Sequence, residues 1–268
     1  MPNSFLERSM TASRADTSQL ALAFSEVGAV FTHARDGGSL RRHVGKAQHK
    51  PNGLFTSVKA RRSMVFEAMH QRDLMWIWEA DPQVVDFASE PLRIELITTI
   101  GPMTYFADAL CLRANGELEI VETKKTRDEV TLDPAYARKL ELVDEACARA
   151  GFKFSILDHH DIRRGWRLSN ARAIAIDRNT TVGTLDKMRL IAAIEANGGS
   201  ITYGEAVAAL STFDNLYDVA ARARLHALIV RRFLSIDIGK RVDLFAPMVL
   251  CKPSDETLAD VFARHRTS

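Results

Sequence analysis

The chain has few of the residues that build special architectures. Its 268 residues include only 3 Cys, 8 Pro and 14 Gly. So few prolines and glycines exclude collagen-like and low-complexity proteins, and three cysteines are too few for a disulfide scaffold. Low cysteine content is typical of a reducing compartment, so we expect a cytoplasmic protein.

Long apolar segments are also missing. No run approaches the roughly 18 residues needed to cross a bilayer, and the N-terminus lacks the apolar core of a signal peptide. We therefore expect no membrane partner. The rest of the composition, 46% hydrophobic and 26% charged, is that of a globular protein with one large domain or two smaller ones.

The net charge of +2 hides an uneven distribution along the chain. Residues 1–66 contain 10 Lys/Arg and 4 Asp/Glu, residues 67–182 contain 15 and 20, and residues 183–268 contain 11 and 10. The three segments therefore carry +6, −5 and +1. A basic arm ahead of an acidic segment indicates contact with nucleic acid and a carboxylate site in the middle of the chain.

Sequence patterns divide the chain into three parts. Residues 1–55 are polar and predict a basic, partly ordered extension. Residues 56–178 predict a mixed sheet with helices, and the expected elements are a helix at 58–79, strands at 92–100, 105–112 and 118–121, a helix at 134–150 and a strand at 152–157. The last strand, helix and strand form a βαβ unit, so the fold class is α/β with an α+β mixed sheet.

Residues 179–268 predict a winged-helix domain. Apolar periodicity predicts helices at 185–196 and 219–233. Thr202 and Glu205 have the spacing of a capping box, which predicts that a further helix begins there, between these two helices. A hairpin around Gly-Lys is predicted by alternating apolar residues, which are Ile236, Ile238, Val242 and Leu244. Three helices and a terminal hairpin are the winged-helix arrangement.

Acidic residues interrupt two of the predicted apolar strands. Asp108 has apolar neighbours on both sides, and burying its charge without a partner would be strongly unfavourable. In the next strand, the period of two places Glu122 and Lys124 on one face. A carboxylate in such a place must be neutralised, ion-paired or bound to a metal.

The turn between these strands decides whether Asp108 and Glu122 share a face. A two-residue loop at 115–116 would place Asp108 opposite Thr123 and send the two carboxylates to opposite faces. A three-residue loop at 114–116, ending in a left-handed glycine, would place Asp108 opposite Glu122. Glycine at the third loop position favours the longer loop.

Two converging carboxylates with a lysine nearby form a site of hard oxygen ligands for Mg²⁺, for which Mn²⁺ substitutes. The metal would activate a water at a scissile phosphate, and Lys124 would hold or deprotonate the nucleophile. The alternative is structural. Asp108 or Glu122 would then pair with Lys124 in a buried salt bridge, which breaks the apolar pattern equally well.

These residues resemble the PD-(D/E)XK nuclease motif, with Ala107-Asp108 as its first element and Glu122-Thr123-Lys124 as its second. The flanking sequence is more specific. It is similar in order to TnsA, the endonuclease subunit of heteromeric transposases, in the segments SVK (57–59), FEAMHQRD (66–73), EADPQVV (79–85) and EPLRI (90–94). The resemblance covers about residues 55–160, and a C-terminal winged helix also occurs in that family.

The resemblance implies a restriction-endonuclease-like core and a metal-dependent cut at the 5′ ends of a transposon. The partners that it implies are a DDE transposase subunit and an AAA+ regulator. It assigns Asp108 and Glu122 as metal ligands and Lys124 as the catalytic lysine. The family's helix acid aligns with Gln71, so either Glu67 serves from the same helix face or the acidic position is lost.

Basic residues predict the contacts with double-stranded DNA. The candidates lie within the helix at 58–79, on the helix at 219–233 and at the tip of the wing, and they are Arg61, Arg62, Arg222, Arg224, Arg231, Lys240 and Arg241. A solvated helix face is the ordinary alternative for such charges.

Two other functions remain open. One is a stand-alone restriction, repair or junction-resolving nuclease with the same core. The other is a DNA-binding or scaffolding subunit whose core has lost its acid at Gln71. Zinc is disfavoured because the His159-His160 pair lacks the spacing of a zinc motif, and Cys111 and Cys147 are interpreted as core residues.

Overall fold

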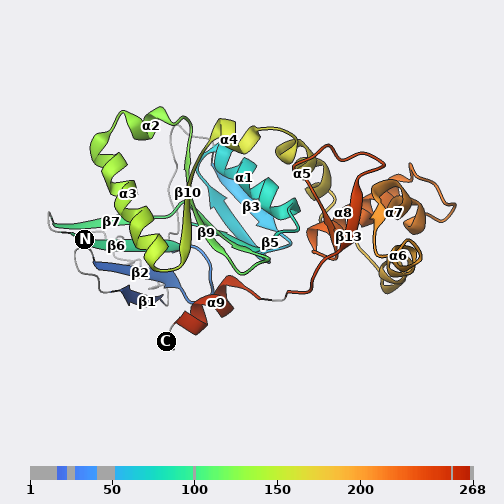
Figure 1. The fold of residues 1–268 in the computed structure, drawn as a ribbon, viewed down its shortest axis with the longest axis horizontal. Helices are drawn as coiled ribbons and strands as arrows, with labels where there is room; N and C mark the ends of the chain where they lie inside the picture. The colour runs from blue at the N-terminus through green and yellow to red at the C-terminus, as the bar shows by residue number, and fades with distance from the viewer. Residues whose placement is uncertain (1–16, 23–27, 41–51, 99–100, 255, 266–268) are drawn as a thin grey trace, which may run out of the picture.

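A four-stranded sheet flanked by helices forms the centre of the protein. The computed structural model describes residues 17–22, 28–40, 52–98, 101–254 and 256–265. The sheet has the order β10-β9-β8-β5, and its strands are β5 (Val84–Ser89), β8 (Ala109–Arg113), β9 (Leu118–Lys124) and β10 (Phe152–Asp158). Strand β10 runs parallel to β9, and α3 (Pro134–Arg149) connects them, which confirms the predicted βαβ unit. Figure 1 shows α3 beside β10, and α1 (Met69–Ala80) beside β9 and β5.

The two faces of this sheet belong to different parts of the core. Ile120 packs with residues of α3, whereas its neighbour Val121 packs with residues of α1, because successive side chains of a strand point to opposite faces. Glu122 has the parity of Ile120 and therefore faces α3. Thr123 has the parity of Val121 and faces α1.

The loop between β8 and β9 is the longer of the two that the sequence allows. The Arg113 N–H donates to the Glu117 carbonyl at 2.8 Å, and Gly116 has φ of +86°, the left-handed conformation of a three-residue loop. The resulting register pairs Ala109 with Val121. Continuing it by one residue places position 108 opposite position 122.

A second sheet has the order β1-β2-β6-β7 and is antiparallel throughout. Its strands are β1 (Thr17–Leu22), β2 (Gly28–Ala34), β6 (Leu92–Thr98) and β7 (Gly101–Phe106). Residues 28–34, from the predicted extension, are thus a strand within a sheet. The remaining expectations for that extension fall largely on residues 1–16, 23–27 and 41–51, which lie outside the described part of the chain.

The prediction of one strand at 105–112 is wrong, because the chain passes there from one sheet to the other. Strand β7 ends at Phe106 and β8 begins at Ala109. At the corner, the Ala107 N–H donates to Leu92 in the second sheet, and the Asp108 carbonyl accepts from Glu90. A polar residue in an apolar run therefore marks a change of sheet.

The predicted helix at 58–79 is wrong in its first half. Strands β3 (Gly53–Ser57) and β4 (Arg62–Phe66) form an antiparallel hairpin, and α1 begins at Met69. The buried carboxylate of Glu79 holds the hairpin turn, because it accepts hydrogen bonds from Ser57 Oγ and from the Val58 N–H at 2.8 Å. This contact with α1 is long-range and leaves no mark in the local sequence pattern.

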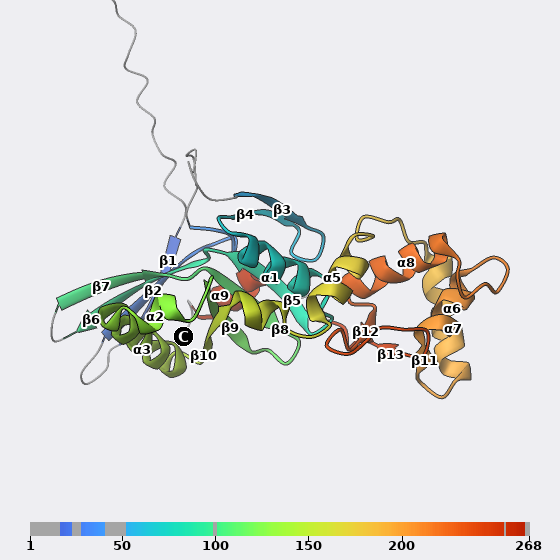
Figure 2. The same ribbon diagram turned by 90° about the horizontal axis from the view of Figure 1, so that it is seen from above.

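Three helices and a small sheet make up the C-terminal part of the chain. In order they are α6 (Thr184–Ala196), β11 (Ile201–Thr202), α7 (Tyr203–Leu210), α8 (Val219–Val230), β12 (Leu234–Ile236) and β13 (Pro247–Leu250), with the sheet order β11-β13-β12. Thr202 and Glu205 form the predicted capping box at the start of α7. Figure 2 shows this part at one end of an elongated molecule.

The predicted hairpin partner of β12 is wrong. Strand β12 pairs with β13, with Leu234 opposite Leu250, and residues 237–246 form the connection. The carbonyls of Leu244 and Ala246 accept hydrogen bonds from the N–H groups of Gly204 and Tyr203. Backbone pairing with the start of α7 therefore replaces the pairing with β12 that alternation alone suggests.

Short helices complete the fold. They are α2 (Asp128–Thr131) and α4 (His159–Arg163) near the ends of β9 and β10, α5 (Arg167–Ala175) between the two ends of the molecule, and α9 (Leu258–His265). Helix α9 returns to the second sheet, where Phe262 stacks on His33 with 4.0 Å between ring centroids. In the described residues, no helix has the length and apolar character needed to cross a bilayer.

A buried charge joins α1 to α4 and α5. Asp73 of α1 is fully buried, and it pairs with Arg163 at 2.9 Å and with Arg172 at 2.5 Å. Both arginines are about half exposed. Solvent can therefore still reach these arginines, whereas the Asp73 carboxylate is fully buried and has only Arg72, at 3.7 Å, as a further cationic partner among the described residues.

We expect Asp73→Ala to lower the free energy of unfolding by about 2–4 kcal/mol, below the upper end of the range for broken buried pairs because the arginines are half exposed. Urea denaturation followed by circular dichroism measures this change. The control is Glu141→Ala, which breaks an exposed pair with Arg138 on α3 and should cost less than about 1 kcal/mol. Equal losses in the two variants would contradict the structural importance of Asp73.

Candidate active site

Asp108 lies at the corner where the chain enters β8, and its carboxylate accepts a hydrogen bond from the backbone of β9 in place of a β8 carbonyl. The register places residue 107 opposite Thr123, but Ala107 is bonded to the second sheet. The Oδ2 atom of Asp108 takes over as acceptor. It accepts from the Thr123 N–H and from Thr123 Oγ1, both at 2.8 Å. The other oxygen, Oδ1, has no hydrogen bond or ion pair within the described residues.

Glu122 is almost completely buried on the α3 face of β9, with 3% of its surface exposed. Its Oε2 accepts from the Tyr105 hydroxyl at 2.5 Å, and its Oε1 accepts from the Tyr136 hydroxyl at 2.6 Å. The Lys124 ammonium pairs with Oε1 at 2.6 Å and lies 4.7 Å from the centre of the Tyr136 ring. The Glu122–Lys124 salt bridge of the structural alternative is thus present, and Asp108 lies outside it.

The charges at this edge of the sheet do not balance. Burial raises the pKa of Asp108 to about 6, and the charge of Glu122 adds to the rise. Burial by itself would lower the pKa of Lys124, but the charge and hydrogen bond of Glu122 outweigh it and raise that pKa well above its usual value. Lys124 therefore stays protonated. Two carboxylates share one ammonium, which leaves an excess of negative charge.

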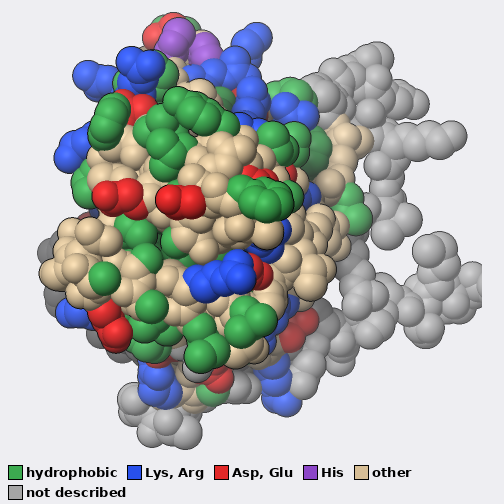
Figure 3. Space-filling model, turned by 90° about the vertical axis from the view of Figure 1, so that its right-hand side faces the viewer, with side chains coloured by type: hydrophobic (Ala, Val, Ile, Leu, Met, Phe, Trp, Pro, Cys, Tyr) green, Lys and Arg blue, Asp and Glu red, His purple; other side chains and the backbone are tan. Residues whose placement is uncertain are grey.

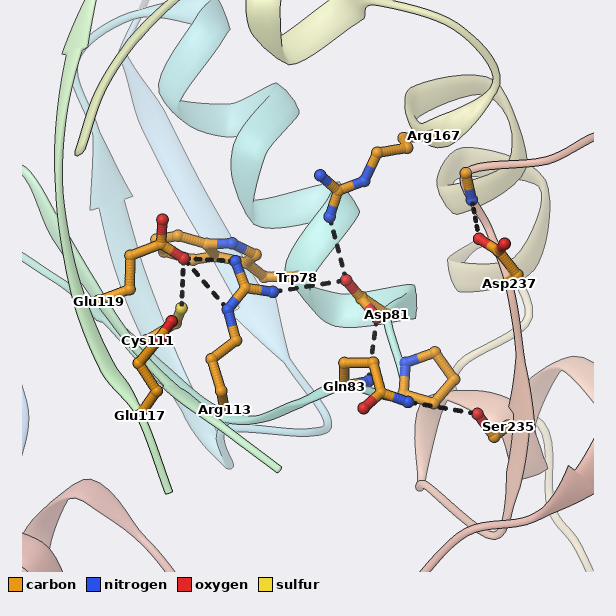
Figure 4. A network of polar contacts seen from close by, with 12 residues as sticks. Trp78, Asp81, Gln83, Cys111, Arg113, Glu117, Glu119, Arg167, Ser235 and Asp237 are labelled. Carbon is orange, nitrogen blue, oxygen red and sulfur yellow. Dashed lines mark hydrogen bonds and ion pairs between the residues drawn. The ribbon is translucent and has the colours of Figure 1, made fainter. Parts of the chain in front are cut away.

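A second buried carboxylate cluster on the same sheet is balanced. In Figure 4, Arg113 lies between Glu119 and Asp81. Its Nη2 is 2.5 Å from Glu119 Oε2, and Arg167 Nη2 is 3.1 Å from Asp81 Oδ2. Burial alone would raise the pKa of Glu119, but the hydrogen bonds and charge of Arg113 lower it. This cluster has the signature of a structural ion network, and the cluster at Asp108 does not.

Both candidates for the helix acid lie near Asp108. A small pocket of about 10 Å³, enough for about one water molecule, is lined by Glu67, Gln71, Glu90, Asp108 and Thr123 together with apolar residues. Glu67 is not on the helix as predicted, because it lies in the bend before α1. Gln71 Oε1 accepts from the Glu67 N–H at 2.8 Å, so the Gln71 side chain holds the bend that precedes α1.

The residues present fit a hard divalent cation. Asp108 offers Oδ1, and Glu122 Oε2 has one hydrogen bond and a lone pair to spare. Mg²⁺ is usually held by one or two carboxylates and completes its shell with water and substrate phosphate. The described residues contain no group of three or more His, Cys, Asp or Glu arranged to hold a metal, so Asp108 and Glu122 are the two carboxylates considered as ligands.

Tyr105 and Tyr136, which hold Glu122, are not predicted from the sequence as part of the site. Tyr105 lies in the strand predicted at 105–112, and Tyr136 lies in the helix predicted at 134–150. Burial raises the pKa of Tyr136 to about 12, so its hydroxyl remains a donor. The only signal for this role is that a buried tyrosine hydroxyl needs a polar partner. It does not say which partner.

The predicted DNA-binding residues differ in their availability. Four of them bind other groups of the protein, namely Arg62 to Asp86, Arg224 to Asp186 and the Leu210 carbonyl, Arg231 to the carbonyls of Arg178 and Thr180, and Lys240 to Asp237. The side chains of Arg61, Arg222 and Arg241 are exposed and have no hydrogen bond or ion pair with any residue that the structure describes. Arg61 lies in the β3–β4 turn and Arg62 in β4, and neither is on a helix.

Figure 3 views the end of the molecule formed by the C-terminal helices, where hydrophobic and uncharged side chains are interspersed with Asp and Glu, and Lys and Arg are most numerous at the upper rim. Phe213, Tyr217 and Phe245 of the C-terminal part have 87%, 73% and 82% of their surface exposed. Exposed aromatic side chains are more typical of contact with a protein than with phosphate.

Comparison of the chain with protein-family models and with curated proteins finds no match.

We expect Asp108→Asn to stabilise the metal-free protein at pH 7–8 by about 1–3 kcal/mol, because a neutral amide keeps the acceptor for Thr123 and removes an unfavourable charge. The folded-state pKa of Asp108, about 6, lies above its ordinary value of 3.8. The folded protein thus binds the proton more tightly, and its stability falls as the pH rises from about 4 to 6.

Urea denaturation in EDTA between pH 4 and pH 8 measures this difference. The advantage of Asp108→Asn should shrink toward pH 4, where the wild-type carboxyl is protonated in the folded protein and partly protonated in the unfolded chain. The control is Asp144→Asn, on the exposed side of α3, which should change stability by less than about 0.5 kcal/mol. An Asp108→Asn variant no more stable than wild type at pH 8 would contradict an uncompensated charge at this position.

Proposed function

We propose that the protein is a Mg²⁺-dependent DNA endonuclease with its active site at Asp108, Glu122 and Lys124. The observation that carries this proposal is the excess negative charge at the end of β9, where Asp108 lacks a cationic partner and Glu122 already has one. A structural network such as that around Arg113 pairs each buried carboxylate with arginine. A divalent cation would complete the charge balance at Asp108.

In this proposal, Asp108 and Glu122 hold the metal, which when bound supplies a polarised water and stabilises charge on the scissile phosphate. Tyr105 and Tyr136 fix the Glu122 carboxylate, so that little reorganisation is needed on binding. Lys124 remains protonated because Glu122 lies beside it. A protonated Lys124 can hold the nucleophile or stabilise negative charge, but it cannot accept a proton.

The finer proposal is a cytoplasmic, TnsA-like subunit with a restriction-endonuclease-like core. It would cut transposon ends beside a DDE transposase under an AAA+ regulator. The element order from α6 to β13 and the three-stranded sheet support a winged-helix domain. The exposed aromatic residues of this part favour a protein partner over DNA as its contact. A stand-alone nuclease and a degenerate DNA-binding subunit are the alternatives.

We expect Asp108→Ala and Lys124→Ala each to slow cleavage of a supercoiled plasmid or transposon-end duplex by at least about 100-fold in Mg²⁺ or Mn²⁺. The assay is run with and without the partner transposase. The control is Lys153→Ala on β10, whose ammonium lies near Glu117 and Glu119 and should not affect the rate.

Unchanged cutting by both variants would refute the site. Cutting by the purified chain alone would favour a stand-alone nuclease, whereas cutting only with the transposase would favour the TnsA-like subunit. Metal binding without cutting under any condition would favour the degenerate subunit.

We expect Gln71→Glu to tighten Mn²⁺ binding by about tenfold, because it adds a carboxylate to the pocket of Asp108 and keeps the acceptor for the Glu67 N–H. Calorimetric titration with Mn²⁺ measures the affinity. Glu67→Gln is the matched variant that removes a charge from the same pocket. If Gln71→Glu has no effect and Glu67→Gln abolishes binding, the helix acid is Glu67.

A further inference from the structure

A large cleft lies between the central sheet and the C-terminal part, away from the pocket of Asp108. Its volume is about 890 Å³, within the range of about 300–1,000 Å³ for small-molecule sites. The β3–β4 turn, the start of β5, α6, the end of α8 and the segment after β13 line it. No wall residue is shared with the pocket of Asp108.

The walls of the cleft carry uncompensated positive charge. Five cationic residues line it, and none forms an ion pair within the described residues: Lys59, Arg61, Lys187, Arg231 and Arg232. Its two carboxylates are neutralised by arginines that are not on its wall. Asp86 pairs with Arg62 at 2.8 Å, and Glu256 pairs with Arg264.

Backbone carbonyls fix three of these cations in place without neutralising them. Lys59 Nζ donates to the carbonyls of Trp78 at 2.7 Å and Asp81 at 2.5 Å. Arg232 Nε donates to the Pro82 carbonyl at 2.8 Å, and Arg231 Nη2 donates to the Thr180 carbonyl at 3.0 Å. The positions of the charges are therefore set before any ligand arrives, which lowers the entropic cost of binding an anion.

Lys59 lies where burial disfavours its positive charge. Burial lowers its pKa to about 8, although the charges of Asp81 and Glu79 act to raise it. Arg232, on the same cleft, adds to the lowering. An anion bound between Lys59 and Arg232 would relieve this repulsion.

The other side of the cleft is apolar. Residues of α6, α8, β13 and the segments beside them contribute Ile191, Leu228, Val230, Phe233, Leu250 and Pro253. Lys187 joins the two sides, because its Nζ lies 5.6 Å from the centre of the Phe233 ring. The ligand that suits such walls has a flat apolar group at one end and several negative charges at the other.

We propose that this cleft binds a nucleoside triphosphate, with the phosphates at Lys59, Arg61 and Arg232 and the base against the apolar wall around Phe233. The volume of about 890 Å³ is that of a small-molecule site, which favours a small molecule over a DNA duplex as the ligand. The proposal does not depend on nuclease activity, since the two sites share no residue.

Calorimetric titration of the full chain in EDTA tests this proposal. The probes are ATP, GTP and the four deoxynucleoside triphosphates, with inorganic triphosphate and a single-stranded oligonucleotide as comparisons. At least one nucleoside triphosphate should bind, and should bind at least tenfold tighter than inorganic triphosphate. The double variant Arg61→Asn, Lys187→Gln should weaken this binding at least tenfold. Asparagine is chosen because Arg61 has φ of +53°, which asparagine tolerates.

Thermal melting shows whether this variant is folded, and Lys59→Gln gives a second, independent test of the same cleft. The control Lys240→Gln removes an exposed cation outside the cleft and should leave the affinity unchanged. Asp108→Asn should also leave it unchanged, so the outcome is separate from that of the nuclease assays.

Three results would overturn the proposal. The first is no binding of any nucleoside triphosphate at millimolar concentration. The second is binding that the cleft variants do not weaken. The third is inorganic triphosphate or the oligonucleotide binding as tightly as every nucleoside triphosphate through the same residues.

Discussion

The pairing register of β8 and β9 is the constraint on which the candidate active site depends. Because the loop at 114–116 has three residues and ends in a left-handed glycine, Arg113 pairs with Glu117, and each later pair follows from that one. A loop one residue shorter would place Asp108 and Glu122 on opposite faces of the sheet. One backbone conformation, at Gly116, therefore sets the register that the proposed metal site requires.

The two acidic clusters of the central sheet differ in their charged partners more than in their burial. Glu119 and Glu122 are both buried on β9, three residues apart. Arg113 pairs with Glu119, so the negative charge at that end of the strand is balanced. At the other end, Lys124 and two tyrosine hydroxyls bind Glu122. The Asp108 carboxylate accepts hydrogen bonds only from neutral groups of Thr123 among the described residues. Unbalanced negative charge destabilises the folded protein, and such charge is common at sites that bind cations.

A continuous apolar core and several charged contacts join the two ends of the molecule through its middle. Asp73 holds α4 and α5 against α1, and the carbonyls of α1 and the segment after it hold Lys59 and Arg232 at the edge of the cleft. The proposed nuclease site and the proposed nucleotide site therefore lie at different places on one framework that shares α1. A ligand in the cleft would contact the central sheet and the C-terminal part together, as its wall contains residues of both.

Features that depend on neighbours along the chain can be predicted from the sequence. They include the βαβ unit, the capping box at Thr202, the loop at 114–116 and the placement of Glu122 with Lys124, because local periodicity and glycine stereochemistry govern them. Other features appear first in the folded structure, and they are the hairpin before α1, the change of sheet at Ala107-Asp108 and the tyrosine hydroxyls that bind Glu122. These features rest on contacts between residues far apart in the sequence, and no local pattern records which distant group will satisfy a buried charge.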